Sequence, residues 1–376
     1  MPHLDIYCYI VYYECDRSYD RSHQSNKIIL NFILSGTPHN INRMKRPTIR
    51  DVATEAGVSR ETVSRVINKK DRVAPETEAK VHAAIAKLGY RPNAIARSLA
   101  RGRSKTLSLI SSNLIDYTFA RILHDSEKIA RLHGYTLIAS SAPDEETFQT
   151  LMDDFIGSQR VEGLIVINAY NDDRFKLVPK NVPTVFVGGW DSEKGHEVNS
   201  VSLDQTSIAE IAVQHLVDLG HRRIAMVSGP LSEKTAQDRV NGFITAMHES
   251  GILFDDSLVV EGDWSASSGY AAFNQLWEID QSITAVSAHN DRMAVGVLRA
   301  AYDKGIVVPE QLSVIGIDDI PLASYFAPSL TTVRLPDFGR EAVELLIQSI
   351  EDTSSLPRHV VLPGEPTIRD STGPVR

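Results

Sequence analysis

From residue 106 onward, short apolar runs alternate with segments of helical periodicity. In the runs, β-branched and other apolar residues follow one another, whereas in the other segments apolar residues recur every three or four positions. The predicted strands are 106–110, 136–139, 163–167, 184–187, 200–203, 223–227, 285–287, 312–317 and 331–334. The predicted helices are 119–133, 144–158, 206–219, 236–250, 291–304 and 338–351. This alternation predicts an α/β fold built on parallel sheets.

The strand predicted at 163–167 indicates how such a sheet is buried. Its residues 164–167 are all apolar, as expected of a central parallel strand that is covered by helices on both faces. The pattern of alternating strands and helices continues for about 230 residues, which is more than one ordinary open sheet uses. We therefore expect two α/β lobes with a cleft between them, where ligands bind at the carboxyl ends of the strands.

A different pattern occupies residues 48–68, where capping residues flank two short helical segments. Thr48, followed by Asp51 three residues later, forms a variant of the capping box. Gly57 can end the first helix in a left-handed conformation, and Ser59 can cap the second. Two short helices joined by a tight turn that contains glycine predict a helix-turn-helix.

The second helix of this motif has an apolar side and a polar side. Val63, Val66 and Ile67 follow helical spacing and are expected to pack on the first helix. The polar side carries Arg60, Glu61, Ser64, Arg65 and Asn68. Arg and Asn suit bidentate contacts to guanine and adenine, whereas Ser64 and Arg65 can equally hold phosphates. A solvated helix face without a nucleic-acid role is the alternative.

A third helix is predicted at 75–88, with Pro75 in its first position. It is followed by Gly89-Tyr90-Arg91-Pro92-Asn93. Together with Asp51-Val52-Ala53, Ala56-Gly57-Val58-Ser59 and Thr62-Val63-Ser64-Arg65-Val66, this run resembles the DNA-binding head and hinge of the lactose-repressor (LacI/GalR) family of bacterial transcription regulators. Ala74 departs from the family, which usually has a capping Ser or Thr there, and it weakens that cap by about 1 kcal/mol.

The resemblance implies four parts: an N-terminal extension (1–43), a helix-turn-helix DNA-binding domain (44–91), a hinge helix and linker (92–104), and a two-lobed effector-binding and dimerisation domain like that of periplasmic binding proteins (105–376). It implies DNA contacts by Thr48, Ser59, Arg60, Glu61, Thr62, Ser64, Arg65, Asn68, Arg72, Tyr90, Asn93, Ala96 and Leu99. By analogy, the hinge helix orders on specific DNA, and Leu99 enters the minor groove as a wedge. A plain linker with an incidental leucine is the alternative.

Polar and aromatic residues beyond the ends of predicted strands are candidates for binding an effector between the lobes. These residues, some of them matched to family motifs, are Tyr117, Phe119, Trp190, Asp191, Arg239, Trp264, Asn290, Asp318 and Phe338. Hydrogen-bonding groups beside flat apolar faces suit a sugar, and a purine or a phosphorylated sugar fits the composition as well. The plainer alternatives are core or lobe packing for the aromatic residues and helix N-caps for Asn290 and Asp318.

Charge is distributed unevenly along the chain. Residues 44–105 carry 15 basic and 6 acidic side chains, residues 1–43 carry four of each, and the remaining residues carry 20 basic and 38 acidic ones. A basic segment joined to an acidic body favours a head that binds a polyanion, with chance clustering as the alternative. The only cysteines are Cys8 and Cys15, which excludes a disulfide framework and is typical of a reducing compartment.

The first 43 residues differ in composition from the rest of the chain. They lack the basic leading segment and the cleavage site of a signal peptide. We interpret them as a disordered upstream extension or the product of a start codon placed too early, with a small strand pair docked on the body as the alternative. No run of about 18 apolar residues occurs, so no membrane-spanning helix is expected.

Motifs of catalysis are missing from the sequence. It contains neither a Gly-Xaa-Ser-Xaa-Gly nucleophile elbow nor a Walker phosphate loop, and its histidines lack metal-ligand spacing. We expect no enzyme activity, no metal and no cofactor. We expect instead a cytoplasmic homodimer that represses transcription, binds a palindromic operator in double-stranded DNA and responds to a small effector, most simply a sugar. The alternatives are a co-repressed regulator that responds to a purine or sugar phosphate, and a sugar-binding protein that does not bind DNA.

Overall fold

The chain consists of two compact units, Met1–Asn93 and Ala94–Arg376, which we call the head and the body. A computed structural model describes residues 47–68, 73–91, 102–114, 117–167, 174–188, 198–352 and 354–375. Within these residues, no helix is long and apolar enough to cross a membrane.

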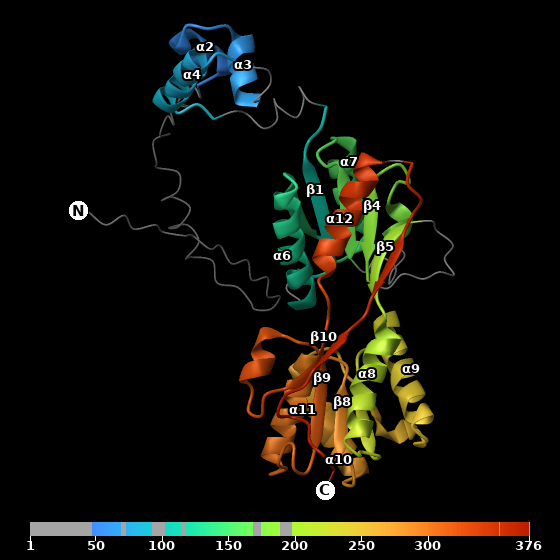
Figure 1. Cartoon of the computed structure of the whole chain (residues 1–376). Coiled ribbons are helices and arrows are strands. Elements are labelled where there is room, and N and C mark those ends of the chain that lie inside the picture. The colour runs from blue at the N-terminus through green and yellow to red at the C-terminus, as the bar shows by residue number, and fades with distance from the viewer. Residues whose placement is uncertain are drawn as a thin grey trace, which may run out of the picture. The chain divides into compact units, whose positions relative to one another are not determined.

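In the described residues of the head, three helices pack around a small apolar core (Figure 1). They are α2 (Ile49–Ala56), α3 (Arg60–Asn68) and α4 (Pro75–Leu88). The predicted caps are confirmed: the backbone amide of Thr48 donates to Asp51 Oδ2 at 2.7 Å, and the amide of Thr62 donates to Ser59 Oγ at 3.1 Å. Gly57 has the left-handed φ of 66° that ends α2. The chain therefore forms the helix-turn-helix that its capping residues predict.

Valines dominate the core of the head. Val52, Val63 and Val81 come from different helices and are completely buried. Val66 is also buried, and Ile67 packs against this core, so the apolar stripe predicted for α3 is confirmed. Ala74 precedes α4 without a side-chain cap, as its departure from the family pattern predicts.

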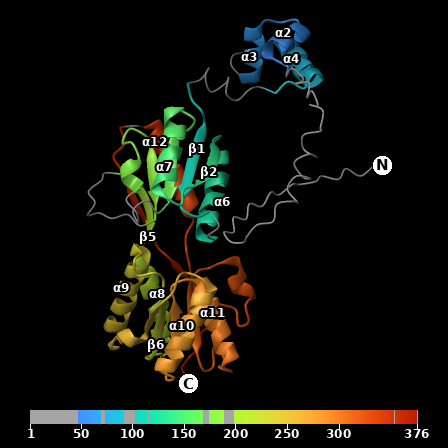
Figure 2. The same ribbon diagram turned by 180° about the vertical axis from the view of Figure 1, so that it is seen from behind.

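The first lobe of the body, the N-lobe, is a six-stranded parallel sheet with helices on both faces. Its strands are β1 (Thr106–Ser111), β2 (Thr136–Ser141), β3 (Gly163–Ile167), β4 (Thr184–Val187), β5 (Asn199–Leu203) and β11 (His359–Leu362), in the order β11-β5-β4-β3-β1-β2. Its helices are α6 (Tyr117–Leu132), α7 (Glu145–Gly157), α12 (Phe338–Glu351) and the short 3-10 helix η1 (Arg174–Leu177). Ile165 and Ile167 of β3 join the core of α6 and α12, whereas Leu164 and Val166 join that of α7. Figure 2 shows α7 on the face opposite to α12.

The second lobe, the C-lobe, repeats this architecture. Its strands are β6 (Ile224–Ser228), β7 (Val259–Glu261), β8 (Ala285–Ala288), β9 (Ser313–Asp318), β10 (Thr331–Arg334) and β12 (Glu365–Thr367), in the order β12-β10-β9-β8-β6-β7. Its helices are α8 (Gln205–Asp218), α9 (Lys234–Glu249), α10 (Ala266–Ile279) and α11 (Asp291–Asp303), with the 3-10 helices η3 (Asp256–Leu258) and η4 (Pro321–Tyr325). Only β12 runs antiparallel to its neighbour among the described pairs.

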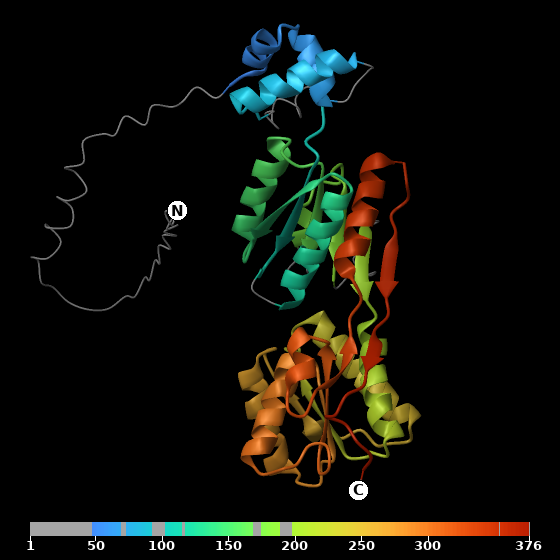
Figure 3. The ribbon, with the colours of Figure 1, turned by 60° about the vertical axis from the view of Figure 1, so that its left-hand side comes forward.

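The chain passes between the lobes from β5 to α8, from β10 to α12 and from β11 to β12 (Figure 3). Each lobe is therefore assembled from separate parts of the sequence. The predicted two-lobed α/β body with parallel sheets, preceded by a helical head, is confirmed.

Three strands and one helix escape the sequence patterns. The strands β7 and β12 have three residues each, and β11 has four residues and is partly exposed, so each is too short to be predicted as a strand from its sequence alone. In α10, Gly269 lowers the helix propensity. A Cβ atom at Gly269 would collide with the backbone of Met293 in α11. This glycine is needed for the close packing of two helices, which is a tertiary requirement.

Candidate functional site

A cavity of about 320 Å³ lies between the two lobes of the body. Six of the predicted effector residues line it: Phe119, Arg239, Trp264, Asn290, Asp318 and Phe338. We call this cavity the interlobe pocket. It lies at the carboxyl ends of strands from both sheets, where the ends of β3, β4 and β9 contribute to its lining, as expected for α/β sheets of this kind.

Arg239 is the central cation of the interlobe pocket. It lies on α9, is only 4% exposed, and donates from Nε to Gln205 Oε1 at 2.8 Å and from Nη1 to the backbone oxygen of His289. Burial lowers the pKa of Arg239 from its usual value, while the carboxylates of Asp318 and Asp291 oppose this shift. Its Nη2 has no hydrogen-bond partner among the residues that the structure describes. A buried guanidinium group fixed at two nitrogens can therefore still donate to a ligand.

Trp264 and Asn290 form a joined part of the wall beside Arg239. The guanidinium carbon of Arg239 lies 5.8 Å from the Trp264 ring centroid, and the indole Nε1 donates to Glu233 Oε1 at 3.2 Å. Asn290 donates from Nδ2 to the backbone oxygen of Trp264 at 3.0 Å and accepts from the amide of Met293 at 2.8 Å. Asn290 is thus the N-cap of α11 and a pocket residue at once. These bonds hold the indole and amide groups in place before any ligand arrives.

A glycine makes room for this indole. At Gly229, a Cβ atom would collide with the Trp264 ring. The close approach of backbone and ring explains why the loop after β6 needs glycine at this position.

Asp318 and the two phenylalanines complete the predicted set. Asp318 ends β9, is 8% exposed and has a positive φ of 125°. Phe119 of α6 and Phe338 of α12 line the pocket and also belong to the apolar core of the body. These two side chains therefore line the pocket and also pack in the core, and their role in binding an effector stays a prediction.

Several lining residues escaped the prediction. They are Ser112, Asn113, Gln205, Glu233 and Thr235 among the polar ones. Gln205 directly follows Asp204, whose carboxylate caps α8 by accepting from the amide of Ser207. A systematic reading of both residues after each strand would have included Gln205, whereas Glu233 lies in a loop whose path no local pattern reveals.

Of the remaining predicted effector residues, only Tyr117 is described, and it does not line the interlobe pocket. Tyr117 lines a smaller cavity beside Arg121 and Asp125, and burial raises the pKa of its hydroxyl. Trp190 and Asp191 fall outside the described residues. No cluster of three or more potential metal-ligating side chains occurs in the part of the chain that the structure covers.

The polar face of α3 is the candidate nucleic-acid interface of the head. The side chains of Arg60 and Glu61 are exposed and lie 3.9 Å apart. A hydrogen bond with its own backbone and one with Ser59 lower the pKa of Glu61. Ser64 and Asn68 are half-buried, and the Asn68 amide donates to the Ser64 backbone oxygen at 2.8 Å. A bidentate contact of this amide with adenine would compete with its bonds to Ser64.

Other predicted DNA contacts have varied surroundings. Thr48 and Ser59 form the helix caps described above, Thr62 lies within 3.1 Å of Ser59 Oγ, and Tyr90 packs against the apolar core of the head. The residues Arg72, Asn93, Ala96 and Leu99 lie outside the described residues, so the predicted hinge wedge does as well.

Comparison with known proteins agrees with this architecture. Residues 48–93 match the model of bacterial regulatory proteins of the lacI family, and residues 213–372 match that of the periplasmic binding protein-like domain. Catabolite control protein A of Priestia megaterium is 36% identical over 86% of this chain and 99% of its own length. The HTH-type transcriptional repressor PurR of Proteus mirabilis is 36% identical over 83% of this chain and 94% of its own.

Two solved structures are similar along most of the chain. The lac repressor dimer bound to operator and the anti-inducer ONPF has a TM-score of 0.78 and 31% identity, and covers 88% of this chain and 100% of its own. The complex of the transcriptional regulator CelR with cellobiose has a TM-score of 0.66 and 32% identity, and covers 87% and 100%. These relatives are regulators and not enzymes. The chain belongs to the lacI family of bacterial regulatory proteins and is a DNA-binding transcriptional regulator.

Proposed function

We propose that this protein represses transcription as a homodimer on a palindromic operator, and that a neutral, polyhydroxylated small molecule in the interlobe pocket controls its affinity for DNA. One observation carries the proposal: the interlobe pocket combines a buried, partly unpaired guanidinium group, a fixed amide and the flat face of an indole. Such a combination binds sugar hydroxyls at its polar groups and the C–H face of a sugar ring at its aromatic ones.

The charges of the lining favour a neutral ligand over a phosphorylated one. Arg239 is the only basic residue among the described lining residues, and Glu233 and Asp318 are acidic. A phosphate group would meet more negative than positive charge there. The volume of about 320 Å³ lies at the lower end of the usual range for ligand pockets, which favours a ligand of one or two rings. Cellobiose, the ligand in the CelR structure, belongs to this chemical class.

For the head, we assign sequence reading to Arg60 and Asn68 on the polar face of α3. The caps Thr48 and Ser59, with Thr62, Ser64 and Arg65, are assigned to the DNA backbone. The hinge contacts of Asn93, Ala96 and Leu99 follow from the family resemblance. This regulator would act in the cytoplasm, where its operator DNA lies.

The dimer is supported by an exposed apolar pair on the C-lobe. Leu322 and Tyr325 of η4 are 60% and 85% exposed, and they lie three residues apart on one short helix. Residues three apart in a 3-10 helix lie on the same face, and apolar side chains gathered on one exposed face suit a contact with a second subunit. Replacing Tyr325 with Asp should shift the protein from dimer to monomer in sedimentation velocity. A variant that stays dimeric would place the interface elsewhere.

The ligand is proposed to release DNA, which is induction. Closure of the lobes changes the geometry that a dimer offers to two half-sites, and a coupling of about 1–3 kcal/mol is typical of such linkage. The test begins with selection of a DNA fragment from genomic DNA. Its affinity is then measured with and without glucose, galactose, ribose, cellobiose, lactose, glucose 6-phosphate and hypoxanthine.

We expect a neutral sugar to raise the midpoint of thermal unfolding and to weaken DNA binding, while glucose 6-phosphate does neither. Binding of hypoxanthine or glucose 6-phosphate alone, with tighter DNA binding, would support the co-repressor alternative. Absence of any preferred fragment would contradict the proposal as a whole.

A further inference from the structure

We propose that Asp319 is a positioning residue that joins the pocket residue Asp318 to two of the three connections between the lobes. Its carboxylate is held by Arg334, the last residue of β10, and by Arg369, two residues beyond β12; β10 and β12 are the C-lobe strands at which these two connections begin or end. The proposal rests on the proposed function for the role of Asp318 in ligand binding. Its structural part, that this carboxylate restrains the lobes, stands independently.

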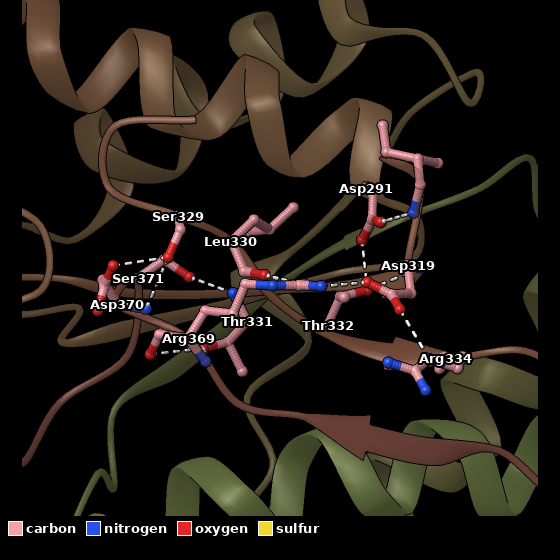
Figure 4. Close-up of polar contacts among 11 residues, drawn as sticks. Asp291, Asp319, Ser329, Leu330, Thr331, Thr332, Arg334, Arg369, Asp370 and Ser371 are labelled. Atoms are coloured by element: carbon pink, nitrogen blue, oxygen red, sulfur yellow. Dashed lines mark hydrogen bonds and ion pairs between the residues drawn. The ribbon is translucent and has the colours of Figure 1, made fainter. Parts of the chain in front are cut away.

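The geometry around Asp319 is specific. Its Oδ2 accepts from Arg334 Nε at 2.8 Å, and its Oδ1 accepts from Arg369 Nη2 at 2.6 Å (Figure 4). The side chains of Asp319 and Arg369 are only 12% and 15% exposed. Although burial opposes ionisation, the two guanidinium groups hold the pKa of Asp319 below its usual value. The carboxylate is therefore ionised at neutral pH and shared by two cations.

Both arginines lie where the chain enters or leaves the C-lobe. Arg334 is the last residue of β10, and the next residue, Leu335, already lines the interlobe pocket. Arg369 follows β12, which arrives from the N-lobe strand β11. Arg369 also donates from Nη1 to the backbone oxygen of Leu330, just before β10. Since β10 and β12 pair with each other, with Arg334 opposite Glu365, the two connections and the Asp319 loop form one unit.

The backbone at the end of β9, where Asp318 and Asp319 lie, has a conformation that contacts with neighbouring elements must stabilise. Asp318 and Asp319 have positive φ values of 125° and 54°, which non-glycine residues rarely adopt. The following amide, that of Ile320, donates to Asp291 Oδ2 at 2.8 Å, and Asp291 Oδ1 accepts from Thr332 Oγ1 at 2.5 Å. The loop is thus fastened to α11 on one side and to the connecting strands on the other. Any movement of the connections is transmitted to Asp318 at the pocket.

The direct test measures how freely the lobes move without ligand. Cys8 and Cys15 are replaced by serine, and exposed Lys128 on α6 and Gln275 on α10 are replaced by labelled cysteines. Distance distributions between these labels are compared for the parent protein and Asp319→Asn. The expected result is a clearly broader or displaced distribution in the variant. Asp303→Asn is the matched control, because Asp303 also pairs with an arginine, at 3.0 Å from Arg299, but lies at the end of α11.

A second measurement follows binding of cellobiose by calorimetry. We expect Asp319→Asn to weaken cellobiose binding at least fivefold, and Asp303→Asn to leave it unchanged. Should Asp319→Asn fail to fold by circular dichroism, Arg334→Gln replaces it, since Arg334 is half-exposed. An unchanged distance distribution in a folded variant would overturn the proposal. If cellobiose fails to bind even the parent protein, the label distances still decide the positioning role, while the sugar-binding proposal is judged by its own ligand panel.

Discussion

The C-lobe and the N-lobe each contribute one wall of the interlobe pocket, and the walls differ in chemistry. The C-lobe wall carries polar groups that are already bonded to one another: Gln205, Glu233, Arg239, Trp264 and Asn290. The N-lobe wall has a larger apolar part, formed by Phe119, Ile122, Ile167, Val187 and Phe338, beside the polar residues Ser112, Asn113 and Thr118. The contrast teaches that one lobe is built to orient a ligand, whereas the other adds apolar contact area when the lobes close around it.

The largest effect should come from the C-lobe wall. Arg239→Met keeps most of the side-chain volume but removes the charged donors, whose hydrogen bonds are worth roughly 1.5–3 kcal/mol. We expect the sugar that stabilises the parent protein to bind about 100-fold more weakly by calorimetry. Arg299→Met, an exposed arginine on α11, should bind it normally. Equal affinity in Arg239→Met and the parent protein would remove the C-lobe wall from ligand recognition.

A substitution in the head should change DNA binding and leave ligand binding at both walls of the pocket unchanged. Arg60→Ala removes a side chain suited to bidentate contact with guanine, worth roughly 1–3 kcal/mol of discrimination. The ratio of affinities for the selected fragment and for random DNA should fall about tenfold in fluorescence anisotropy, with sugar binding intact. Lys80→Ala, on the exposed side of α4, should leave that ratio unchanged. An equal loss on both DNAs in Arg60→Ala would make Arg60 a phosphate contact.

The N-lobe wall should respond more weakly. Phe119→Leu keeps an apolar surface and loses only the flat aromatic face, for which we expect about a two- to fivefold loss of sugar affinity. Phe155→Leu, which lies in the N-lobe core outside the pocket, controls for a general loss of packing. A loss as large as that of Arg239→Met would break the proposed contrast between the walls.

The smallest effect concerns a buried carboxyl group behind the C-lobe wall. Burial raises the pKa of Asp291 to about 7. Because this value lies above that of the unfolded chain, the folded state keeps a proton that the unfolded state has lost, so stability falls as the pH rises from about 4 to about 7 and levels off above that. Asp291→Asn removes this contribution. The midpoint of thermal unfolding of the variant, relative to the parent protein, should therefore rise by a few degrees between pH 5 and pH 8.

The effects of other titratable groups on stability are the same in both proteins and cancel when their unfolding midpoints are compared. Burial lowers the pKa values of His215 and His221, so their contributions make stability rise with pH, but both proteins share them. Asparagine cannot accept hydrogen bonds from both Ile320 and Thr332 at its two side-chain atoms, so a constant offset is expected in addition. Parallel curves for the two proteins over this pH range would show that Asp291 is ionised throughout.

The sequence predicts a feature of this molecule when the residues that produce the feature are neighbours along the chain. Adjacent residues are enough to recognise the helix caps at Thr48 and Ser59 and the apolar run of β3, and the structure confirms these elements. Arg239, Asn290 and Asp318 could be singled out because they match family motifs or follow predicted strands. The bond from Arg239 to Gln205 joins residues from separate helices, and no local pattern contains it.

Two further features depend on tertiary structure in the same way. A glycine is needed at position 269 of α10 because α11 packs so closely there that no side chain fits. Asp319 resembles any polar loop residue in the sequence. Its partner Arg334 ends the neighbouring strand β10, and its partner Arg369 reaches it only after the chain has passed through the N-lobe and returned. Partners of this kind become visible only in the folded structure.

The central claim is that ligand in the interlobe pocket and DNA at the head are linked through the body. The most direct test is a titration of the selected DNA fragment with the parent protein and with Arg239→Met, each with and without a saturating neutral sugar that binds the parent protein. We predict that the sugar weakens DNA binding by the parent protein about tenfold or more, and that Arg239→Met binds the DNA equally well but ignores the sugar at the same concentration. A DNA affinity that the sugar leaves unchanged in the parent protein, or shifts equally in both proteins, would contradict the account.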